Sequence, residues 1–492
     1  MNKKIFLILS LVVFVFGFLL LDTLNAEYII NLFSLFLHKQ LNIEFWKIGL
    51  YQTGLELILF SSLALLFILF YNTFPKQVLL ISFSGIILFF LGSVLYYSVN
   101  IPINTPGNDD YWVFLNFLNH YSSTKNIGEI FNQFDDQREI FRRLMAVILF
   151  NLNAFNFKTI IFFANICLIG IVCLFYKSIS LSGWHKDFLF LILIIIVFQF
   201  QYYDATLWAS AGTAAVCGFF FTFSCFYFLS KPSRYFALAL LFPLLYITIN
   251  IVGFVTVLIG SIMLLQMKNK KGFLIWIATS LLVFILYFHN FTVDKEHHFS
   301  FVAQELSFNK LQECLMYSFI FLGSSMQLFH TTSLPIGVGI LLWFFFLFLS
   351  YKKYFLKNSP IYFSLLFLLS VSLLIPICRE EKSLQTPLAI RYSLFSIMAI
   401  CCSILSIAEL ISTEQRKKYF YTILSIALIY HLSANIFFLP EAVIRKEKLI
   451  IMIDNFKQTE KLKPVSCDLN QPVNETTILR QSIEKKFYKI PE

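Results

Sequence analysis

The chain has 492 residues, of which 58% are hydrophobic and 13% are charged, and its mean hydropathy is +0.75. Soluble domains are close to half apolar and a quarter charged, so this composition excludes an ordinary soluble globular protein. It indicates an all-α polytopic membrane protein, in which the distribution of the net charge of +10 matters more than its size.

Apolar runs predict about 13 transmembrane helices, because a helix needs about 20 apolar residues to cross the hydrocarbon core. The first run, Ile5 to Leu21, could pass for a signal peptide, but no clear cleavage site follows it, so we interpret it as an uncleaved first helix. The other single spans are 55–73, 78–98, 156–176, 188–203, 208–230, 273–289, 333–351, 360–378, 391–411 and 419–438.

The run from Tyr235 to Met267 contains no charge in 33 residues. It is too long for one upright helix and too short for two full spans. Because Pro243, Asn250 and Gly253 interrupt its middle, we predict two short helices that form a tight hairpin.

Lysine and arginine gather at one set of span ends, which orients the chain by the positive-inside rule. This face carries Lys3, Lys4, Lys76, Lys177, Lys186, Lys231, Arg234, Lys268, Lys270, Lys271, Lys352, Lys353, Lys357, Arg416, Lys417 and Lys418. The N-terminus is then cytoplasmic and the C-terminus extracytoplasmic. The abundance of Phe, Ile, Asn and Lys is typical of an AT-rich genome, so we expect a bacterial cytoplasmic membrane.

This orientation defines the outer loops and two parts of the chain. We expect a transmembrane domain over 1–439 and a polar extracytoplasmic tail over 440–492. The outer loops are 22–54, 99–155, 204–207, 290–332 and 379–390, and 99–155 is the main one.

The main outer loop opens with paired acids. Thirty-one uncharged residues, Val78 to Asn108, precede Asp109, Asp110, Tyr111 and Trp112. Carboxylates left unpaired near a membrane cost several kcal/mol, so we interpret the pair as a candidate general base or cation ligand. The alternative is that one acid caps the helix that follows, although capping needs only one.

A second polar cluster follows about 25 residues later in the same loop. Arg138 and Arg142 are four residues apart and therefore share a helix face, where guanidinium groups suit phosphate oxygens. The alternative is a solvated, salt-bridged helix that enters the membrane. The cluster consists of Asp135, Asp136, Gln137, Arg138, Glu139, Phe141, Arg142, Arg143 and Leu144.

Further candidates lie at the outer ends of later spans. Arg379 and Arg391 run against the positive-inside trend, so we expect an anionic partner such as a lipid phosphate or the loop carboxylates; snorkelling to the interface is the alternative. Tyr202, Tyr203 and Trp208 surround a short outer loop.

Several other kinds of chemistry have little or no support in the sequence. There is no glycine-rich phosphate loop, no nucleophile elbow and no HExxH motif. His297 and His298 lack a third ligand at zinc spacing. Cys378 and Cys467 both fall in outer segments and could form a disulfide, although nothing in the sequence brings them together.

Short motifs resemble the GT-C superfamily of integral-membrane glycosyltransferases. Asp109-Asp110-Tyr111-Trp112 looks like the acidic motif in an early outer loop of that superfamily. Asp136-Gln137-Arg138 and Phe141-Arg142-Arg143-Leu144 are similar to a Glu-His-Arg…Phe-x-Arg-Leu pattern of uncharacterised bacterial members, with Asp136 and Gln137 in place of the glutamate and histidine. Leu322-Gly323-Ser324 resembles another short element of that set. The acidic loop here follows the third span, not the first, which leaves open whether Asp109 or Asp110 has the central role.

The resemblance implies inverting transfer of a sugar from a polyprenyl-phosphate donor to an extracytoplasmic glycan, lipid or protein. Asp109 or Asp110 would be the catalytic base, and a divalent cation such as Mg²⁺ or Mn²⁺ could take part. The donor phosphate would contact Arg138, Arg142, Arg379 and Arg391. The substrates would contact Trp112, Asp136, Tyr202, Tyr203 and Trp208. Membrane lipid is a further partner, and no nucleic acid is expected.

The sequence leaves three other functions open. A transporter or flippase of lipid-linked sugars predicts charges near the bilayer midplane and matched broken helices, whereas Glu56 and Glu409 fall near the ends of the predicted spans. An O-antigen-type polymerase or ligase relies on arginines in large late outer loops, whereas the main polar loop here is early and acidic. A structural or assembly role is the third.

Overall fold

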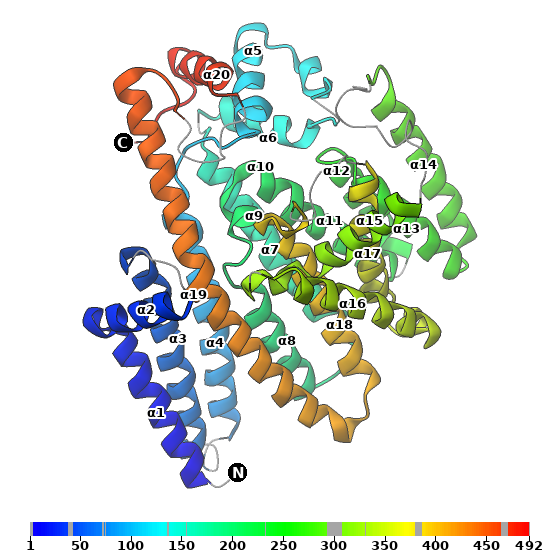
Figure 1. Cartoon of the computed structure of the whole chain (residues 1–492). Coiled ribbons are helices and arrows are strands. Elements are labelled where there is room, and N and C mark those ends of the chain that lie inside the picture. Colours follow the sequence, from blue (N-terminus) through cyan, green and yellow to red (C-terminus); the bar gives the residue numbers. More distant parts are fainter. Residues whose placement is uncertain are drawn as a thin grey trace. The chain divides into compact units, whose positions relative to one another are not determined.

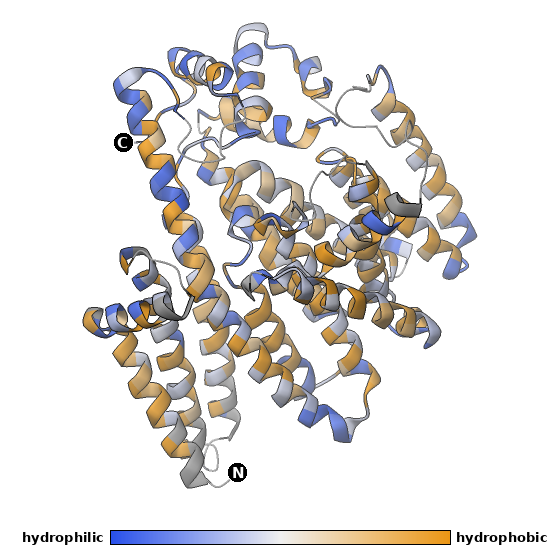
Figure 2. Ribbon diagram, viewed as in Figure 1, coloured by the Kyte–Doolittle hydropathy of each residue, from blue (hydrophilic) through white to orange (hydrophobic). Residues whose placement is uncertain are grey.

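The computed structural model describes residues 3–491 except 38–42, 71–72, 74, 135–136, 154, 232, 293–307, 330, 379–385 and 464–470. No strand occurs in these ranges, which confirms the all-α prediction. Hydrophobic residues run along most of the long helices (Figure 2), as expected for segments that face lipid or one another.

The described residues contain nine helices that are long and apolar enough to cross a membrane, or ten if the bent pair Ser10–Leu21 and Leu24–Leu32 is one span. The expected number of about 13 is therefore not confirmed. Four predicted spans account for the difference between 13 and nine. One is α1 (Lys3–Leu21), which bends into α2 (Thr23–Leu37), and the other three are helices too short to cross a membrane. These are α8 (Trp184–Val197), α12 (Phe236–Ile247) and α13 (Gly253–Gln266).

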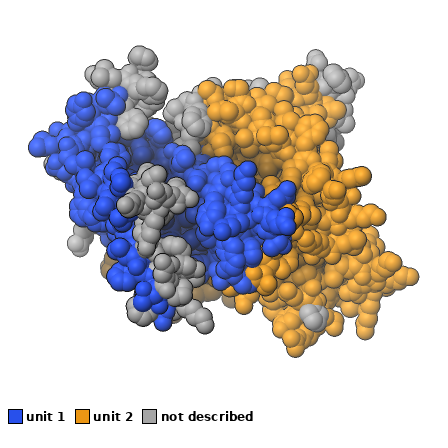
Figure 3. Space-filling view, turned by 90° about the horizontal axis from the view of Figure 1, so that it is seen from below, with its two compact units in different colours: residues 1–101, 183–203, 413–447 blue, residues 102–182, 204–412, 448–492 orange. Residues whose placement is uncertain are grey.

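The chain divides into two compact units, coloured separately in Figure 3. Unit 1 comprises residues 1–101, 183–203 and 413–447, and unit 2 comprises 102–182, 204–412 and 448–492. The polar tail expected from residue 440 is not set apart by this division, because α19 runs without a break from Thr413 to Thr459 and residues 448–492 group with unit 2.

Unit 1 is built on close contact between α1 and α3 (Ile43–Phe70). A Cβ atom on Gly17 or Gly54 would lie within 3.0 Å of the other helix, so these glycines let the two backbones approach. Unit 1 also contains α4 (Pro75–Asn100), α8 and the first part of α19.

Unit 2 contains a helical bundle with a core rich in aromatic rings. For example, the ring centroid of Phe219 lies 4.5 Å from that of Phe395. The apolar bundle helices are α7 (Phe157–Ser178), α10 (Ala209–Gly212), η3 (Thr213–Cys217), α11 (Gly218–Leu229), α12, α13, α14 (Lys270–Phe288), α15 (Phe308–Leu322), α16 (Ser333–Tyr351), α17 (Ser359–Cys378) and α18 (Ser393–Leu410). Short 3-10 turns occur at Ser233–Tyr235, Ser324–Phe329, Tyr354–Leu356, Thr386–Leu388 and Ile390–Tyr392.

Two features of the bundle bear on the sequence predictions. The run over 235–267 does form two short helices, α12 and α13, and they contact each other as a hairpin requires. In contrast, α15 was not predicted, because its first turns carry Asn309, Lys310, Gln312 and Glu313. Its apolar part nevertheless packs against α16 and α17.

The main outer loop and the C-terminal segment form one subdomain of unit 2. The loop contains η1 (Tyr111–Asn116), α5 (Phe117–Thr124), η2 (Ile127–Phe131) and α6 (Ile140–Asn151), and the C-terminal segment contains α20 (Pro472–Glu484). Figure 1 shows α20 beside α5, and the two helices contact each other.

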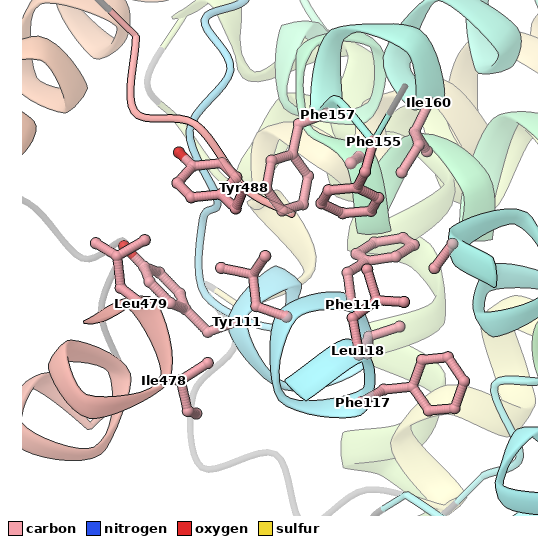
Figure 4. Packing of buried hydrophobic residues seen from close by; sticks show 14 of the residues in the cluster. Tyr111, Phe114, Phe117, Leu118, Phe155, Phe157, Ile160, Ile478, Leu479 and Tyr488 are labelled. Carbon is pink, nitrogen blue, oxygen red and sulfur yellow. The ribbon is translucent and has the colours of Figure 1, made fainter. Parts of the chain in front are cut away.

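The core of this subdomain is aromatic and joins segments that are more than 300 residues apart. Figure 4 shows Ile478, Leu479 and Tyr488 from the C-terminal segment beside Tyr111 and the rings that follow it. The side chain of Asn119 donates hydrogen bonds to Ile478 O at 3.0 Å and to Ser482 Oγ at 3.1 Å. The C-terminal segment is therefore part of the structure that holds the loop.

Candidate functional site

Unit 2 encloses a partly open cavity of about 370 Å³ at one end of its bundle. At this end α10 and α18 begin and α12 and α17 terminate. Its polar and aromatic wall is formed by Asp109, Gln137, Arg142, Trp208, Ser210, Tyr246, Asn250, Arg391 and Tyr392. Its apolar wall is formed by Ala211, Ala214, Ala215, Ile251, Val252, Val255, Val371, Leu374, Ile375 and Phe395.

Asp109 is placed at the cavity by the turn that begins η1. Asn108 adopts a positive φ of 35°, and the carbonyl of Asp109 accepts the first helical hydrogen bond, from Val113 N at 2.8 Å. The side chain of Asp109 is exposed, and it makes no hydrogen bond or ion pair with the described residues. Its carboxylate is therefore available to a substrate.

Asp110 has a different environment, although it is adjacent in sequence. It is 1% exposed, and Oδ1 accepts hydrogen bonds from Ser210 N at 2.9 Å and from Ser210 Oγ. Oδ2 accepts a third from Gly107 N at 3.2 Å. Burial raises the pKa of Asp110 to about 7, partly offset by these bonds. This arrangement suits Asp110 for holding the loop to α10, and it leaves Asp109 as the acid that lines the cavity.

Arg142 reaches the cavity from α6 and is held by a buried carboxylate. Its Nη1 lies 2.7 Å from Oε1 of Glu139, a residue with no exposed surface. Gln137 donates to the same oxygen at 2.6 Å. The Nε atom of Arg142 is buried and has no hydrogen-bond partner among the described residues, so the guanidinium keeps donor capacity for an anion.

Arg391 approaches the cavity from the turn before α18. Its guanidinium lies 5.2 Å from the centroid of the Tyr392 ring, which orients it through a cation–π contact. It makes no hydrogen bond or ion pair within the described part of the chain. Two arginines, Arg142 and Arg391, therefore line a cavity with one carboxylate, that of Asp109.

The break between α12 and α13 contributes backbone to the same cavity. Asn250, Ile251 and Val252 line it, and α13 begins at the next residue. The carbonyl of Thr248 accepts a hydrogen bond from Phe141 N at 3.0 Å, which joins this turn to α6. Irregular backbone at membrane depth is tolerated where it lines a cavity, and a helix N-terminus carries a partial positive charge that favours anions.

Trp208 also lines the cavity. Its Nε1 donates to Gly107 O at 3.2 Å, so the indole ring is fixed beside the turn that carries Asp109. The structure thus brings together Asp109, Arg142, Trp208 and Arg391, which were all predicted as site residues from the sequence.

Four other predicted site residues do not line this cavity. The backbone N and Nε of Arg138 bond to Tyr287, and its Nη atoms bond to the carbonyls of Phe131 and His289, so these donors hold the loop to the end of α14. Trp112 is partly buried against the subdomain core. Tyr202 and Tyr203 are buried within unit 1.

Some predicted residues lie outside the described part of the chain. These are the phosphate candidate Arg379, the substrate candidate Asp136, the histidines His297 and His298, and Cys467 of the possible disulfide.

Sequence reasoning did not select Ser210, Tyr246, Asn250 or Tyr392 as site residues, although all four line the cavity. A signal existed for Asn250, because it interrupts an uncharged run where a helix break was predicted. No local pattern marked Ser210 or Tyr246, which reach the cavity through tertiary packing.

The donor set does not by itself define a metal site. Asp109 is the one carboxylate in the cavity wall, and no group of three or more His, Cys, Asp or Glu side chains gathers anywhere in the described ranges. A divalent cation there would have to take most of its ligands from substrate or water.

Comparison of the chain with protein-family models, curated proteins and solved structures yields no match. The function is therefore argued from the cavity.

Proposed function

We propose that the protein is a membrane glycosyltransferase that moves a sugar from a polyprenyl-phosphate donor to an extracytoplasmic glycan, lipid or protein acceptor. One observation carries the proposal: the exposed carboxylate of Asp109, which no described residue bonds, shares a cavity with Arg142, Arg391 and an apolar wall. A base, cations for a leaving phosphate and an apolar surface for a lipid tail are the groups that this reaction needs.

Asp109 is the proposed base. It takes the proton of an acceptor hydroxyl while the acceptor oxygen forms a bond to the anomeric carbon of the donor sugar. The bond between that carbon and the phosphate oxygen breaks, and its electron pair stays on the phosphate. Attack from the side opposite the phosphate inverts the anomeric centre.

Arg142 and Arg391 stabilise the charge that develops on the departing phosphate, since guanidinium donors pair well with phosphate oxygens. The N-terminus of α13 adds a partial positive charge in the same wall. Glu139 is a positioning residue, because it holds Arg142 from a buried site.

The donor class follows from the cavity wall and from the sequence. A lipid-phosphate sugar stores an activated bond, so no nucleotide-binding loop is needed, and none occurs in the sequence. The apolar side chains of Val255, Val371, Leu374 and Ile375 offer a surface to the first units of a polyprenyl chain. We place this site on the extracytoplasmic side of a bacterial cytoplasmic membrane.

The test compares cell-surface glycans and polyprenyl-phosphate sugars by mass spectrometry in cells with the wild-type protein, a deletion, or Asp109→Asn. We expect the deletion and the variant to lose one sugar from the glycan while its lipid-linked donor accumulates. An Asp109→Asn strain with unchanged glycan and donor pools would exclude the proposed base, and an unchanged deletion strain would exclude the transferase.

Transport of lipid-linked sugars is the second candidate, favoured by the position of Glu56. Sequence analysis placed Glu56 near a span end, but α3 begins at Ile43, so Glu56 lies near the middle of the apolar stretch Trp46–Leu66. Buried charges at such depth are typical of transport pathways. A transporter predicts that the donor accumulates on the cytoplasmic side in the deletion, whereas a transferase predicts accumulation on the outer side.

A further inference from the structure

Unit 1 contains a buried polar cluster formed by α3, α4, α8 and α19. Glu56 is 1% exposed and lies in the middle of an apolar segment, and His431 and Asn435 from α19 are each 1% exposed. Ionisable groups inside a membrane segment are costly, so they persist where they are paired or where they serve a function.

Two amide donors and one imidazole nitrogen surround one oxygen of Glu56. Its Oε1 lies 2.8 Å from Gln52 Nε2, 2.8 Å from Asn435 Nδ2 and 3.1 Å from His431 Nε2. Its Oε2 is buried and has no hydrogen-bond partner among the described residues, and neither has Oδ1 of Asn435. The cluster therefore has buried acceptors that remain open to one more hydrogen.

The surroundings of His431 decide which of its nitrogens can take that hydrogen. Nδ1 lies 2.8 Å from the carbonyl oxygen of Ile195, which can only accept, so Nδ1 carries a hydrogen in either charge state. The imidazole ring packs edge-on against Phe90. Nε2 lies 3.1 Å from Glu56 Oε1 and 2.8 Å from Asn435 Nδ2, so the neutral ring accepts a hydrogen bond from Asn435 at this nitrogen. Nε2 is therefore the ring nitrogen at which a second proton would bind, between Glu56 and Asn435.

No fixed positive charge of the described residues balances Glu56. From α4 the facing titratable group is Tyr97, whose hydroxyl donates to Gln52 Oε1 at 2.9 Å. From α8 the contact is the Ile195 carbonyl, and residues 5–21 of α1 contain no ionisable side chain. Lys47 is engaged by Glu27 at 2.7 Å and by Glu44 at 3.2 Å. Without a proton, the pair would leave a net negative charge buried in the membrane segment.

An open groove lies next to this pair. Glu44, Lys47, Gln52, Gly92, Tyr96 and Tyr97 contribute to its lining between α3 and α4. Gln52 belongs to the groove wall and also donates directly to Glu56, so a single side chain separates the groove from the carboxylate.

We propose that Glu56 and His431 form an intramembrane site that binds one proton, which enters from the groove beside Gln52 and Tyr97. Loading transfers a proton from water in the groove to His431 Nε2 or to the Glu56 carboxylate, and the net charge of the pair changes from −1 to 0. The site lies in unit 1 and does not depend on the glycosyltransferase proposal, which concerns the cavity of unit 2.

The test uses the full-length protein in lipid nanodiscs, with ¹⁵N-labelled histidine for NMR and infrared spectra of the carboxyl groups. The His431 signals are identified by their loss in His431→Gln. At neutral pH we expect either a doubly protonated His431 or a protonated carboxyl band that disappears in Glu56→Gln. A singly protonated His431 together with an unprotonated Glu56 at neutral pH would overturn the proposal.

Two variants separate the pair from its surroundings. Glu56→Gln should abolish the shared proton and leave His431 singly protonated on Nδ1. Glu44→Gln removes a carboxylate from the same helix and the same groove, and it should leave the spectra of the pair unchanged. A loss of the shared proton in Glu44→Gln would show that remote charge, not the contact between Glu56 and His431, sets the protonation.

The route is tested separately with Gly92. A Cβ atom on Gly92 meets nothing within 4 Å, so the branch point of a Gly92→Leu side chain has open space in the groove wall. We expect slower deuterium exchange of the pair after transfer to heavy water, and Gly337→Leu, at another open position, should have no effect. Unchanged exchange in Gly92→Leu would exclude the groove as the route.

Discussion

Charged and polar groups lie among apolar helices both in the cavity of unit 2 and in the polar cluster of unit 1. The two sites differ in whether these side chains have hydrogen-bond partners within the protein. In the cavity, the side chains of Asp109 and Arg391 have no hydrogen-bond partner among the described residues. In the cluster, Gln52, His431 and Asn435 all converge on Glu56. Polar groups that face open space are suited to a substrate, whereas groups that face one another support the structure or hold a small ligand such as a proton.

The strongest test of this distinction is Asp109→Asn. Because no described residue bonds to the Asp109 carboxylate, its loss should leave the unfolding free energy unchanged, while removal of a general base lowers the transfer rate by about 10²- to 10⁴-fold. Transfer assays and unfolding of the purified variant measure both effects. A large loss of stability with a normal transfer rate would show that Asp109 supports the fold and is not the base.

Glu139→Ala, unlike Asp109→Asn, should destabilise the protein. It removes the buried partner of Arg142 at 2.7 Å, and breaking one side of a buried ion pair costs about 3–5 kcal/mol. The midpoint of unfolding in a mixed-detergent titration measures this loss. Glu44→Ala is the matched control, because its ion pair with Lys47 is exposed and should contribute little.

The pH dependence of stability tests the position of Asp110. Its pKa rises to about 7 on folding, so the folded protein retains a proton that the unfolded chain loses near pH 4. The protonated Asp110 carboxyl contributes its full stabilisation at pH values below the pKa it has in the unfolded chain. This contribution is lost as the pH rises through about 7, the pKa in the folded protein. The change amounts to a few kcal/mol, at about 1.4 kcal/mol for each pKa unit.

Asp110→Asn cannot titrate and should remove this part of the pH profile between pH 4 and pH 8. Unfolding midpoints of the two proteins across that range provide the measurement. Parallel profiles for wild type and variant would show that another group produces the slope.

Arg391→Gln should reduce transfer without destabilising the protein. Loss of one charge-assisted hydrogen bond to the departing phosphate costs about 1.5–3 kcal/mol, which is about 10- to 100-fold in rate. Arg138→Gln is the contrasting variant, because the donors of Arg138 bond to carbonyls and their loss should affect stability first. Equal rate losses in the two variants would remove the distinction between them.

Asn435→Ala should produce the smallest effect, in the cluster of unit 1. It removes one of the two amide donors to a buried carboxylate, which costs about 1–3 kcal/mol in stability. Because the variant does not touch the cavity, the transfer rate of the folded protein should stay at the wild-type level. A rate loss without a stability loss would link the cluster to the reaction.

Part of the candidate site could be predicted because its residues break the local pattern. Asp109, Arg142 and Arg391 are conspicuous against an apolar background. Asp109 and Arg142 lie in the predicted main outer loop, and Arg391 lies at the outer end of a predicted span. The distinction between Asp109 and Asp110 could not be predicted, because it depends on Ser210, which is 100 residues away and donates to Asp110. The structural role of Arg138 could not be predicted either, because most of its hydrogen-bond partners lie on a segment about 150 residues away.

The sequence by itself determined the all-α membrane character, most of the long helices and the break near Asn250, because hydropathy and helix-breaking residues act locally. Tertiary structure alone decided which helices are too short to span, that Glu56 lies near mid-span, and that the C-terminal segment packs against the main outer loop. The physical reason is that burial and hydrogen bonding depend on partners distant in the chain, and those partners determine whether a polar residue supports the fold or faces a substrate.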